Sequence, residues 1–324
     1  MFRLGHRLEL DGLRGIAALI VVVNHYFGGV NAALGVDIFF VLSGFLITLL
    51  LSEEFGESQV LSLRYFYLRR VLRLLPALVY TIIAVYILSR FGFLSFPSVM
   101  LPYILTYTAN LPFAFGWLST NHNTNPLALT WSLAIEEQFY LVWPFVFSGL
   151  LKLQEKKALV RRLLGAVLVW EMYRWWIVIT TFSANRLYYS TDCHAQLLLI
   201  GCILGLIRSE TPELTLSLRA RWLWSLAVLL VFCLIFSGLG TFDLYTVLLT
   251  QWGILISIII WASTLQLGLV NQVLKNKILV GVGKISYGVY PYHIPGGTAR
   301  NSGPSSQSQV HRQFTEPGLL YAPG

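Results

Sequence analysis

The sequence predicts an all-α fold, a polytopic bundle of transmembrane helices. Hydrophobic residues make up 56% of the 324 residues and charged residues only 12%, whereas a soluble domain is about 25% charged. The mean hydropathy is +0.67. Apolar runs close to the length that crosses a bilayer recur about nine times. These candidate segments lie near residues 12–30, 34–51, 71–89, 98–116, 129–150, 163–182, 193–207, 222–239 and 245–267.

The apolar pattern stops near residue 295. We therefore divide the chain into a membrane domain, 1–295, and a tail, 296–324, which is rich in Gly, Pro, Ser and Gln and is predicted to be disordered. The first apolar run could be mistaken for a signal peptide. It carries Asp11, Arg14 and His25, however, and no small-residue cleavage site follows it, so we expect a retained helix.

Basic residues predict the orientation of the bundle. The net charge is +8, and the Lys and Arg residues gather between apolar runs. They form no stripe interleaved with aromatic residues, so membrane topology explains them better than nucleic-acid binding does. Because Lys and Arg mark cytoplasmic loops, we expect a multi-pass protein of the plasma membrane, which is the inner membrane in bacteria, with its N-terminus in the cytoplasm and lipids around it.

The basic loops and the number of apolar runs disagree on how many times the chain crosses the membrane. The basic loop 152–162 falls on the cytoplasmic side only if two crossings separate it from the basic group 64–73. Run 98–116 contains two prolines and an asparagine, and irregular backbone at membrane depth is tolerated where it lines a protein cavity. Either 98–125 is re-entrant or only partly inserted, or it spans normally and the charge rule fails once.

Charged side chains in the first apolar run are candidate functional groups, because charge within a membrane is costly. Arg14 and His25 are eleven residues apart, about three turns plus 20°, so they share one helix face. Asp11 lies on the same face and can pair with Arg14 at i,i+3. The alternatives are a snorkelling anchor for Arg14 and a hydrogen-bonded packing residue for His25.

Two further charged groups are candidates. Glu136 and Glu137 enter an otherwise apolar run, where a carboxylate needs a cationic partner or takes up a proton. Consecutive helical residues diverge by about 100°, so the two acids cannot share one partner equally; an interfacial position is the alternative. Arg69, Arg70 and Arg73 either signal cytoplasmic topology or capture phosphate through bidentate hydrogen bonds.

The remaining polar groups decide no function by themselves. Asp37, Ser43, Tyr140 and His293 are candidate substrate-binding or structural residues. Ser43-Gly44 lacks a nucleophile-elbow context, so helix packing is the expected role of Ser43. The three cysteines have no metal or redox spacing, and the chain carries no zinc or nucleotide-binding motif, so no metal is predicted.

Five ordered blocks carry a resemblance to a known family. They are LDGLRGIAA at 10–18, GVDIFFVLSGFLI at 35–47, YLRRVLRLLP at 67–76, WSLAIEEQFY at 131–140, and ISYGVY at 285–290 with His293. Together with the Arg-x10-His pair of Arg14 and His25, these blocks resemble the membrane acyltransferase type 3 family. The resemblance covers roughly residues 8–295.

The resemblance implies an integral membrane O-acyltransferase. Such a protein would move an acyl group, above all acetyl from cytosolic acetyl-CoA, to a hydroxyl of a cell-envelope glycan or lipid-linked glycan, such as O-antigen, exopolysaccharide or peptidoglycan. His25 would be the general base or a transient acyl carrier, with Glu136 or Glu137 orienting it. The phosphates of CoA would be held by Arg69, Arg70, Arg73 and Arg14.

Two departures from the family pattern stand out. Family members often carry Arg at the position of His194 and Asp at that of Gln196, which leaves donor or acceptor detail open. The family also continues past His293 into a final membrane helix, whereas this chain changes to a polar tail. We therefore expect the last family helix to be missing. A frameshift, a truncation or a damaged gene would explain the change and would leave the chain inactive.

An exporter of acylated or carboxylated small molecules is the main alternative, since intramembrane His, Arg and Glu serve proton relays and substrate paths equally well. Transport should persist without acyl-CoA, whereas acylation should not. A purely structural membrane subunit fits less well, because Arg14 and Glu136 lie in apolar runs. The acceptor, the acyl chain length and the oligomeric state are left open.

Overall fold

The computed structural model describes most of the chain between residues 5 and 286. The described residues are 5, 7–27, 32–118, 125–153, 156–181, 183–211, 217, 219, 220, 222, 224–226, 248–265 and 268–286. Within them every regular element is a helix, which confirms the predicted all-α class. His293 and the tail 296–324 lie outside the described residues.

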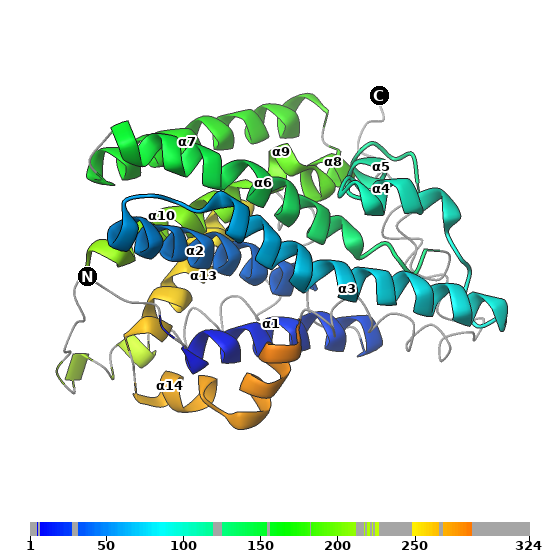
Figure 1. Cartoon of the computed structure of the whole chain (residues 1–324), viewed down its shortest axis with the longest axis horizontal. Coiled ribbons are helices and arrows are strands. Elements are labelled where there is room, and N and C mark those ends of the chain that lie inside the picture. The colour runs from blue at the N-terminus through cyan, green and yellow to red at the C-terminus, as the bar shows by residue number, and fades with distance from the viewer. Residues whose placement is uncertain are drawn as a thin grey trace, which may run out of the picture.

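The chain forms long helices with groups of short helices between them (Figure 1). They are α1 (Leu8–Phe27), α2 (Ala32–Ser58), α3 (Leu63–Arg90), η1 (Ser98–Met100), α4 (Leu101–Leu105), α5 (Leu111–Ala114), α6 (Thr130–Leu153), α7 (Lys156–Thr180), α8 (Ala184–Tyr189), α9 (Thr191–His194), α10 (Gln196–Glu210), α13 (Leu249–Thr264) and α14 (Gly268–Leu274), followed by a helix over 277–286.

Four of the described helices are long and apolar enough to cross a membrane, judged by length and composition. They are Leu8–Phe27, Ala33–Ser58, Leu63–Arg90 and Lys157–Thr180. A helix rises about 1.5 Å per residue, so the 24 residues of α6 also exceed the roughly 30 Å of bilayer hydrocarbon. A helical membrane bundle is therefore confirmed.

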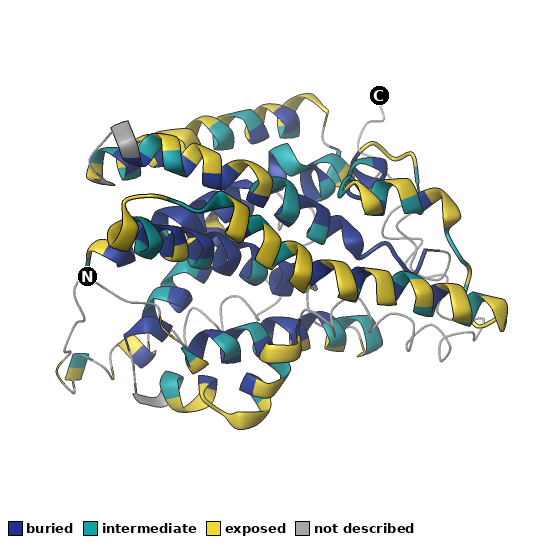
Figure 2. Cartoon of the chain, viewed as in Figure 1, coloured by how far each residue is buried: buried dark blue, intermediate teal, exposed yellow. Residues whose placement is uncertain are grey.

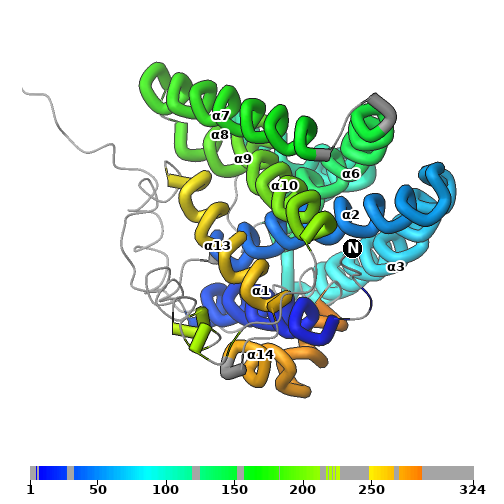
Figure 3. Tube along the Cα trace, turned by 90° about the vertical axis from the view of Figure 1, so that its left-hand side faces the viewer, coloured from blue at the N-terminus to red at the C-terminus, as the bar shows by residue number. Residues whose placement is uncertain are grey.

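α2 is the central helix of the bundle and contacts α1, α6, α10 and α13 (Figure 3). Its apolar window is 83% buried inside the protein, against 22% for α3 and for α7. The outer faces of α3 and α7 are exposed and apolar (Figure 2), with Leu68, Leu72 and Leu75 as examples on α3. Apolar exposed faces are what lipid-facing helices require.

Glycines bring α2 and α10 into backbone contact. A Cβ atom on Gly44 would lie 1.9 Å from the carbonyl oxygen of Leu198, and one on Gly201 would lie 2.0 Å from that of Val41. Gly201 and Gly205 are one turn apart, the small-xxx-small spacing that lets membrane helices approach closely. The close approach positions α9 and the start of α10 against the polar residues of α2.

α2 and α6 run parallel to each other. Successive side chains of the two helices pair in the same order, Ser43 with Glu136 and then Thr48 with Trp143. α3 runs in the opposite direction, because Tyr67 near its start bonds to the backbone of Leu141 in the second half of α6. The end of α3 and the start of α6 therefore lie at the same end of the bundle.

The segment between α3 and α6 makes no crossing in its described part, 98–118. η1, α4 and α5 contain three, five and four residues, far too few for a span at about 1.5 Å per residue. They lie together at the end of the bundle away from the N-terminus (Figure 1). Helices this short favour the alternative in which 98–125 does not span the membrane. How deeply the segment is inserted stays a prediction.

The two ends of the bundle differ in charge. The end near the N-terminus contains the α2–α3 and α6–α7 turns (Figure 1), with Arg64, Lys157, Arg161 and Arg162 close to them. The other end contains the short helices α4, α5 and α8. One basic end is what a fixed membrane orientation requires. That this end is cytoplasmic stays a prediction.

Candidate active site

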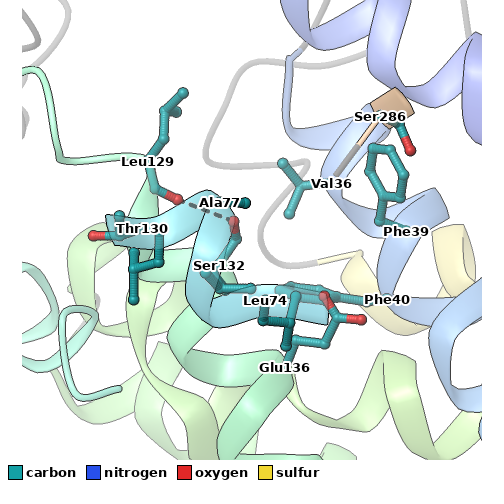
Figure 4. A pocket seen from close by; sticks show the side chains of 12 residues that line it. Val36, Phe39, Phe40, Leu74, Ala77, Leu129, Thr130, Ser132, Glu136 and Ser286 are labelled. Atoms are coloured by element: carbon teal, nitrogen blue, oxygen red, sulfur yellow. Dashed lines mark hydrogen bonds between the residues drawn. The ribbon is translucent and has the colours of Figure 1, made fainter. Parts of the chain in front are cut away.

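A pocket lies between α2, α3, α6 and the helix 277–286 (Figure 4). Its empty space is about 770 Å³, a volume that includes the open solvent at its mouth. A mostly apolar wall with a few polar groups is typical of small-molecule sites. The lining residues are Val36, Phe39, Phe40, Leu74, Ala77, Leu78, Leu129, Thr130, Ser132, Leu133, Glu136 and Ser286.

Glu136 is the acidic residue of this lining, and two hydroxyl groups hold it in place. Ser43 Oγ donates a hydrogen bond to Glu136 Oε1 at 2.5 Å, and the Tyr140 hydroxyl donates to the same oxygen at 2.7 Å. Hydrogen bonds to a carboxylate are shorter and stronger than neutral ones. Because both bonds use Oε1, the second oxygen is left to face a bound molecule.

Arg70 supplies the positive charge behind the pocket. Its Nη2 donates to Glu137 Oε1 at 2.9 Å and lies 4.0 Å from Glu136 Oε1. Its Cζ lies 3.2 Å from the ring centroid of Tyr140, as in a cation–π contact. Because the whole group is largely shielded from solvent, neither the acids nor the guanidinium could stay charged here without the other.

The expected division between the two acids is present in the structure: Glu137 binds Arg70 directly, whereas Glu136 turns toward the pocket. The expected cluster of three arginines is not present. Arg69 and Arg73 are exposed on α3, while Arg70 is drawn inward by the two carboxylates. The expectation that all three hold one phosphate group together is therefore wrong for Arg70.

The first helix shows one expected pair. Arg14 lies 3.9 Å from Asp11, as the i,i+3 spacing predicts. His25 Nδ1 is 2.7 Å from the carbonyl oxygen of Val21 on its own helix. The carboxylates of α6 bind Ser43 on α2 and Arg70 on α3. That one of them also orients His25 stays a prediction.

His25 lies one helical turn beyond Val21 on α1. Val21 packs against the start of α2, since a Cβ on Gly35 would lie 2.6 Å from the Val21 side chain. Val36, the residue after Gly35, lines the pocket, whereas His25 is not among the lining residues. The proximity of His25 to the pocket stays a prediction.

Asp37 and His194 form a buried pair that the sequence analysis missed. His194 Nε2 lies 2.9 Å from Asp37 Oδ1, and both side chains are completely buried. The residues are 157 positions apart, so no local spacing connects them. In the sequence, the departure of His194 from the family pattern was the sign that this position has an unusual partner. Gln196, the other departure, donates to Thr250 Oγ1 at 2.8 Å and likewise has a structural partner.

Polar side chains tie the short helices to α6. Gln138 Nε2 donates to the carbonyl of Tyr107 at 2.6 Å and to Asn110 Oδ1 at 3.0 Å, and Asn110 Nδ2 donates to Thr191 Oγ1 at 2.9 Å. Burial raises the pKa of the Tyr107 hydroxyl, and the charge of Glu137 raises it further, so this hydroxyl stays protonated at neutral pH. The network fixes the turns of α6 that carry the two acids.

No cluster of metal-binding side chains is present among the residues that the structure describes. The polar groups of the pocket lining, with Glu136 among them, are of the kind that can form hydrogen bonds, transfer protons and stabilise charge in acyl transfer.

Comparison with known proteins agrees with this chemistry. A family model described as an acyltransferase domain matches residues 7–297. The chain belongs to this acyltransferase family. The match includes every residue of the pocket and of the buried pairs described above.

Over the aligned region, curated relatives are about a third identical to this acyltransferase. It is 31% identical over 306 residues to the peptidoglycan O-acetyltransferase OatA of Listeria monocytogenes, covering 89% of this chain and 49% of the relative. It is 33% identical over 307 residues to the putative peptidoglycan O-acetyltransferase YrhL of Bacillus subtilis, covering 88% of this chain and 48% of the relative. It is 30% identical over 313 residues to the O-acetyltransferase OatA of Staphylococcus aureus, covering 88% of this chain and 50% of the relative.

The acyltransferase chain thus spans about half the length of the curated relatives it matches. No solved structure matches it.

Proposed function

We propose that this chain is a membrane O-acetyltransferase that transfers acetyl groups to hydroxyls of a cell-envelope glycan of the peptidoglycan class. The observation that carries the proposal is the pocket with Glu136 in its wall, inside a chain of the acyltransferase family. The named relatives support the acetyl group and the glycan.

His25 is the proposed general base. Its Nδ1 faces the carbonyl oxygen of Val21, which can only accept a hydrogen bond, so in the neutral ring Nδ1 carries the proton and donates. Nε2 then carries the lone pair of the ring and is the atom that can accept a proton. A backbone carbonyl that fixes the tautomer in this way is a common arrangement for reactive histidines.

The proposed step is direct transfer. The acceptor hydroxyl attacks the thioester carbonyl while Nε2 of His25 takes the hydroxyl proton, and the carbon–sulfur bond breaks. The proton then passes from the imidazolium to the departing thiolate, so the products are the O-acetyl glycan and a free thiol. Glu136 Oε2 would accept a hydrogen bond from another polar group of the substrate and hold it in the pocket.

Acetyl-CoA is the proposed donor, and the basic end of the bundle is its proposed cytoplasmic entry side. Arg70 is occupied by the carboxylates of α6. Contacts to phosphate would therefore fall to the exposed Arg69 and Arg73, with Arg14 closer to the N-terminus. Arginine suits this role because its guanidinium matches phosphate oxygens in a bidentate way.

The test is acetyl transfer by the purified full chain in nanodiscs. Radiolabelled acetyl-CoA and soluble peptidoglycan fragments are supplied, and label on the glycan is measured for the wild type, His25→Ala and the control His311→Ala in the tail. We expect the His25 variant to lose at least about a hundredfold in rate, the usual contribution of a general base, and the control to retain full activity.

Two results would count against the proposal. Equal labelling by His25→Ala and the wild type would remove His25 from the mechanism. Uptake or release of acetylated compounds by proteoliposomes in the absence of acetyl-CoA, with no label on glycan, would favour the exporter.

A further inference from the structure

The ring of His194 lies between two hydrogen-bond acceptors. Nδ1 is 2.8 Å from the backbone carbonyl oxygen of Tyr188, and Nε2 is 2.9 Å from Asp37 Oδ1. A carbonyl oxygen accepts only, and so does an ionised carboxylate. A neutral imidazole has a single N–H, so it can satisfy one of these contacts but not both.

The pair therefore holds one proton more than a neutral histidine and a free carboxylate would hold. Without it, two lone pairs would face each other at 2.9 Å in a site with no exposure to solvent, which is costly because a buried polar group needs its partner. The proton lies between Nε2 and Oδ1, and either atom can be its formal owner.

Charged groups of α7 lie near the pair. Arg174 Nη1 is 4.0 Å from Glu171 Oε2, and Arg174 also interacts electrostatically with Asp37.

The pair supports the wall of the pocket from behind. Phe40, which lines the pocket, has its ring 5.1 Å from the ring of His194. Trp131 lies 5.7 Å from His194 and 6.3 Å from Phe40. Trp131 stands between the lining residues Thr130 and Ser132 at the start of α6. A shift of His194 would move both walls.

We propose that Asp37 and His194 are positioning residues for acetyl transfer: the hydrogen bond between them holds His194 against Phe40 and Trp131, and these two rings support the wall of the pocket. This inference rests on the proposed function. If the bond were lost, the carboxylate and the imidazole would separate or reorient, and Phe40 and Trp131 would lose their support.

The decisive variant is Asp37→Asn. An asparagine amide can donate to Nε2 of a neutral His194, whose Nδ1 still donates to Tyr188, so both hydrogen bonds persist without an extra proton. We expect this variant to fold and to keep acetyl transfer within about threefold of the wild type. Asp37→Ala leaves no hydrogen-bonding group opposite Nε2 of His194, so we expect it to lose about tenfold in kcat/KM.

The third variant, His194→Gln, tests positioning from the other side. It cannot satisfy the carbonyl of Tyr188 and Asp37 with the same geometry, so we expect a loss of about tenfold in kcat/KM, the effect of one buried charge-assisted hydrogen bond. His311→Ala is the control and should keep the wild-type activity.

Thermal unfolding in nanodiscs separates this inference from the proposed function, because it needs no acetyl transfer. We expect Asp37→Ala to melt several degrees below Asp37→Asn, because only the asparagine keeps the hydrogen bond to His194. Identical melting temperatures for the two variants would overturn the inference, whatever the activity assay shows. A missing acetyl transfer in the wild type, with the expected difference in unfolding, would overturn the proposed function alone.

Discussion

Ser43 of α2 donates a hydrogen bond of 2.5 Å to Glu136 of α6, 93 residues further along the chain. The bond joins the central helix to the acid in the wall of the pocket. Ser43 therefore helps to hold the Glu136 carboxylate in place, a role in addition to the helix packing that its sequence context indicates. Tyr140 donates to the same oxygen, so the position of this carboxylate depends on both hydroxyls.

Replacing Ser43 with alanine should loosen Glu136 without releasing it. The bond from Tyr140 remains, so we expect about 1–2 kcal/mol of lost stability and roughly a fivefold to thirtyfold lower kcat/KM, the range for one hydrogen bond to a charged group. Steady-state acetyl transfer and thermal unfolding would measure the two effects. Ser58→Ala is the matched control, because the Ser58 hydroxyl is exposed and bonds within its own turn. Equal rates for the two variants would exclude a role for the Ser43 bond.

Replacing Arg70 with leucine should destabilise the protein strongly. Two carboxylates would remain in a largely buried place without their cation, which costs about 3–5 kcal/mol. In the double variant with Glu137→Gln, we expect part of this loss to be recovered, because the acid bound most closely to Arg70 is then neutral.

Unfolding in detergent micelles would be compared with that of Arg69→Leu. Arg69 is exposed on the same helix, so its loss should change the stability by less than about 0.5 kcal/mol. A double variant no more stable than Arg70→Leu would show that the ion pair is not what stabilises α3 against α6.

The contact between α2 and α10 should not tolerate a methyl group. In Gly201→Ala the new Cβ would lie 2.0 Å from the carbonyl oxygen of Val41, so the helices must separate. We expect a loss of several degrees in melting temperature and less folded protein in the membrane. Gly165→Ala of α7 is the control, since its Cβ would meet no atom within 4 Å. Similar melting temperatures for the two variants would contradict the close approach.

The two ends of the bundle should label from opposite sides of the membrane. Single cysteines at Val60, in the α2–α3 turn, and at Trp117, after α5, would be introduced into a chain whose three native cysteines are replaced by alanine. An impermeant maleimide applied to intact cells should modify the cysteine at position 117 and leave that at position 60 unmodified until the membrane is opened. Labelling of both from one side would mean that 98–125 crosses.

Local patterns in the sequence were enough for several features of the site. Hydropathy predicts the helices because each one must satisfy its own backbone hydrogen bonds in lipid. The pair of Asp11 and Arg14 follows from helical spacing, and so does the different environment of Glu136 and Glu137. The family blocks indicate an acyltransferase, which the match over residues 7–297 confirms.

The tertiary structure alone decided which distant residues meet. Spacing along the chain carries no information on the contacts of Ser43 with Glu136 or of Asp37 with His194, since they arise from how α2 packs between α6 and α10. The same holds for Arg70, which the sequence groups with Arg69 and Arg73 but which the carboxylates of α6 draw away. A buried charge goes to the nearest opposite charge that packing brings to it, and helix packing depends on the whole chain at once.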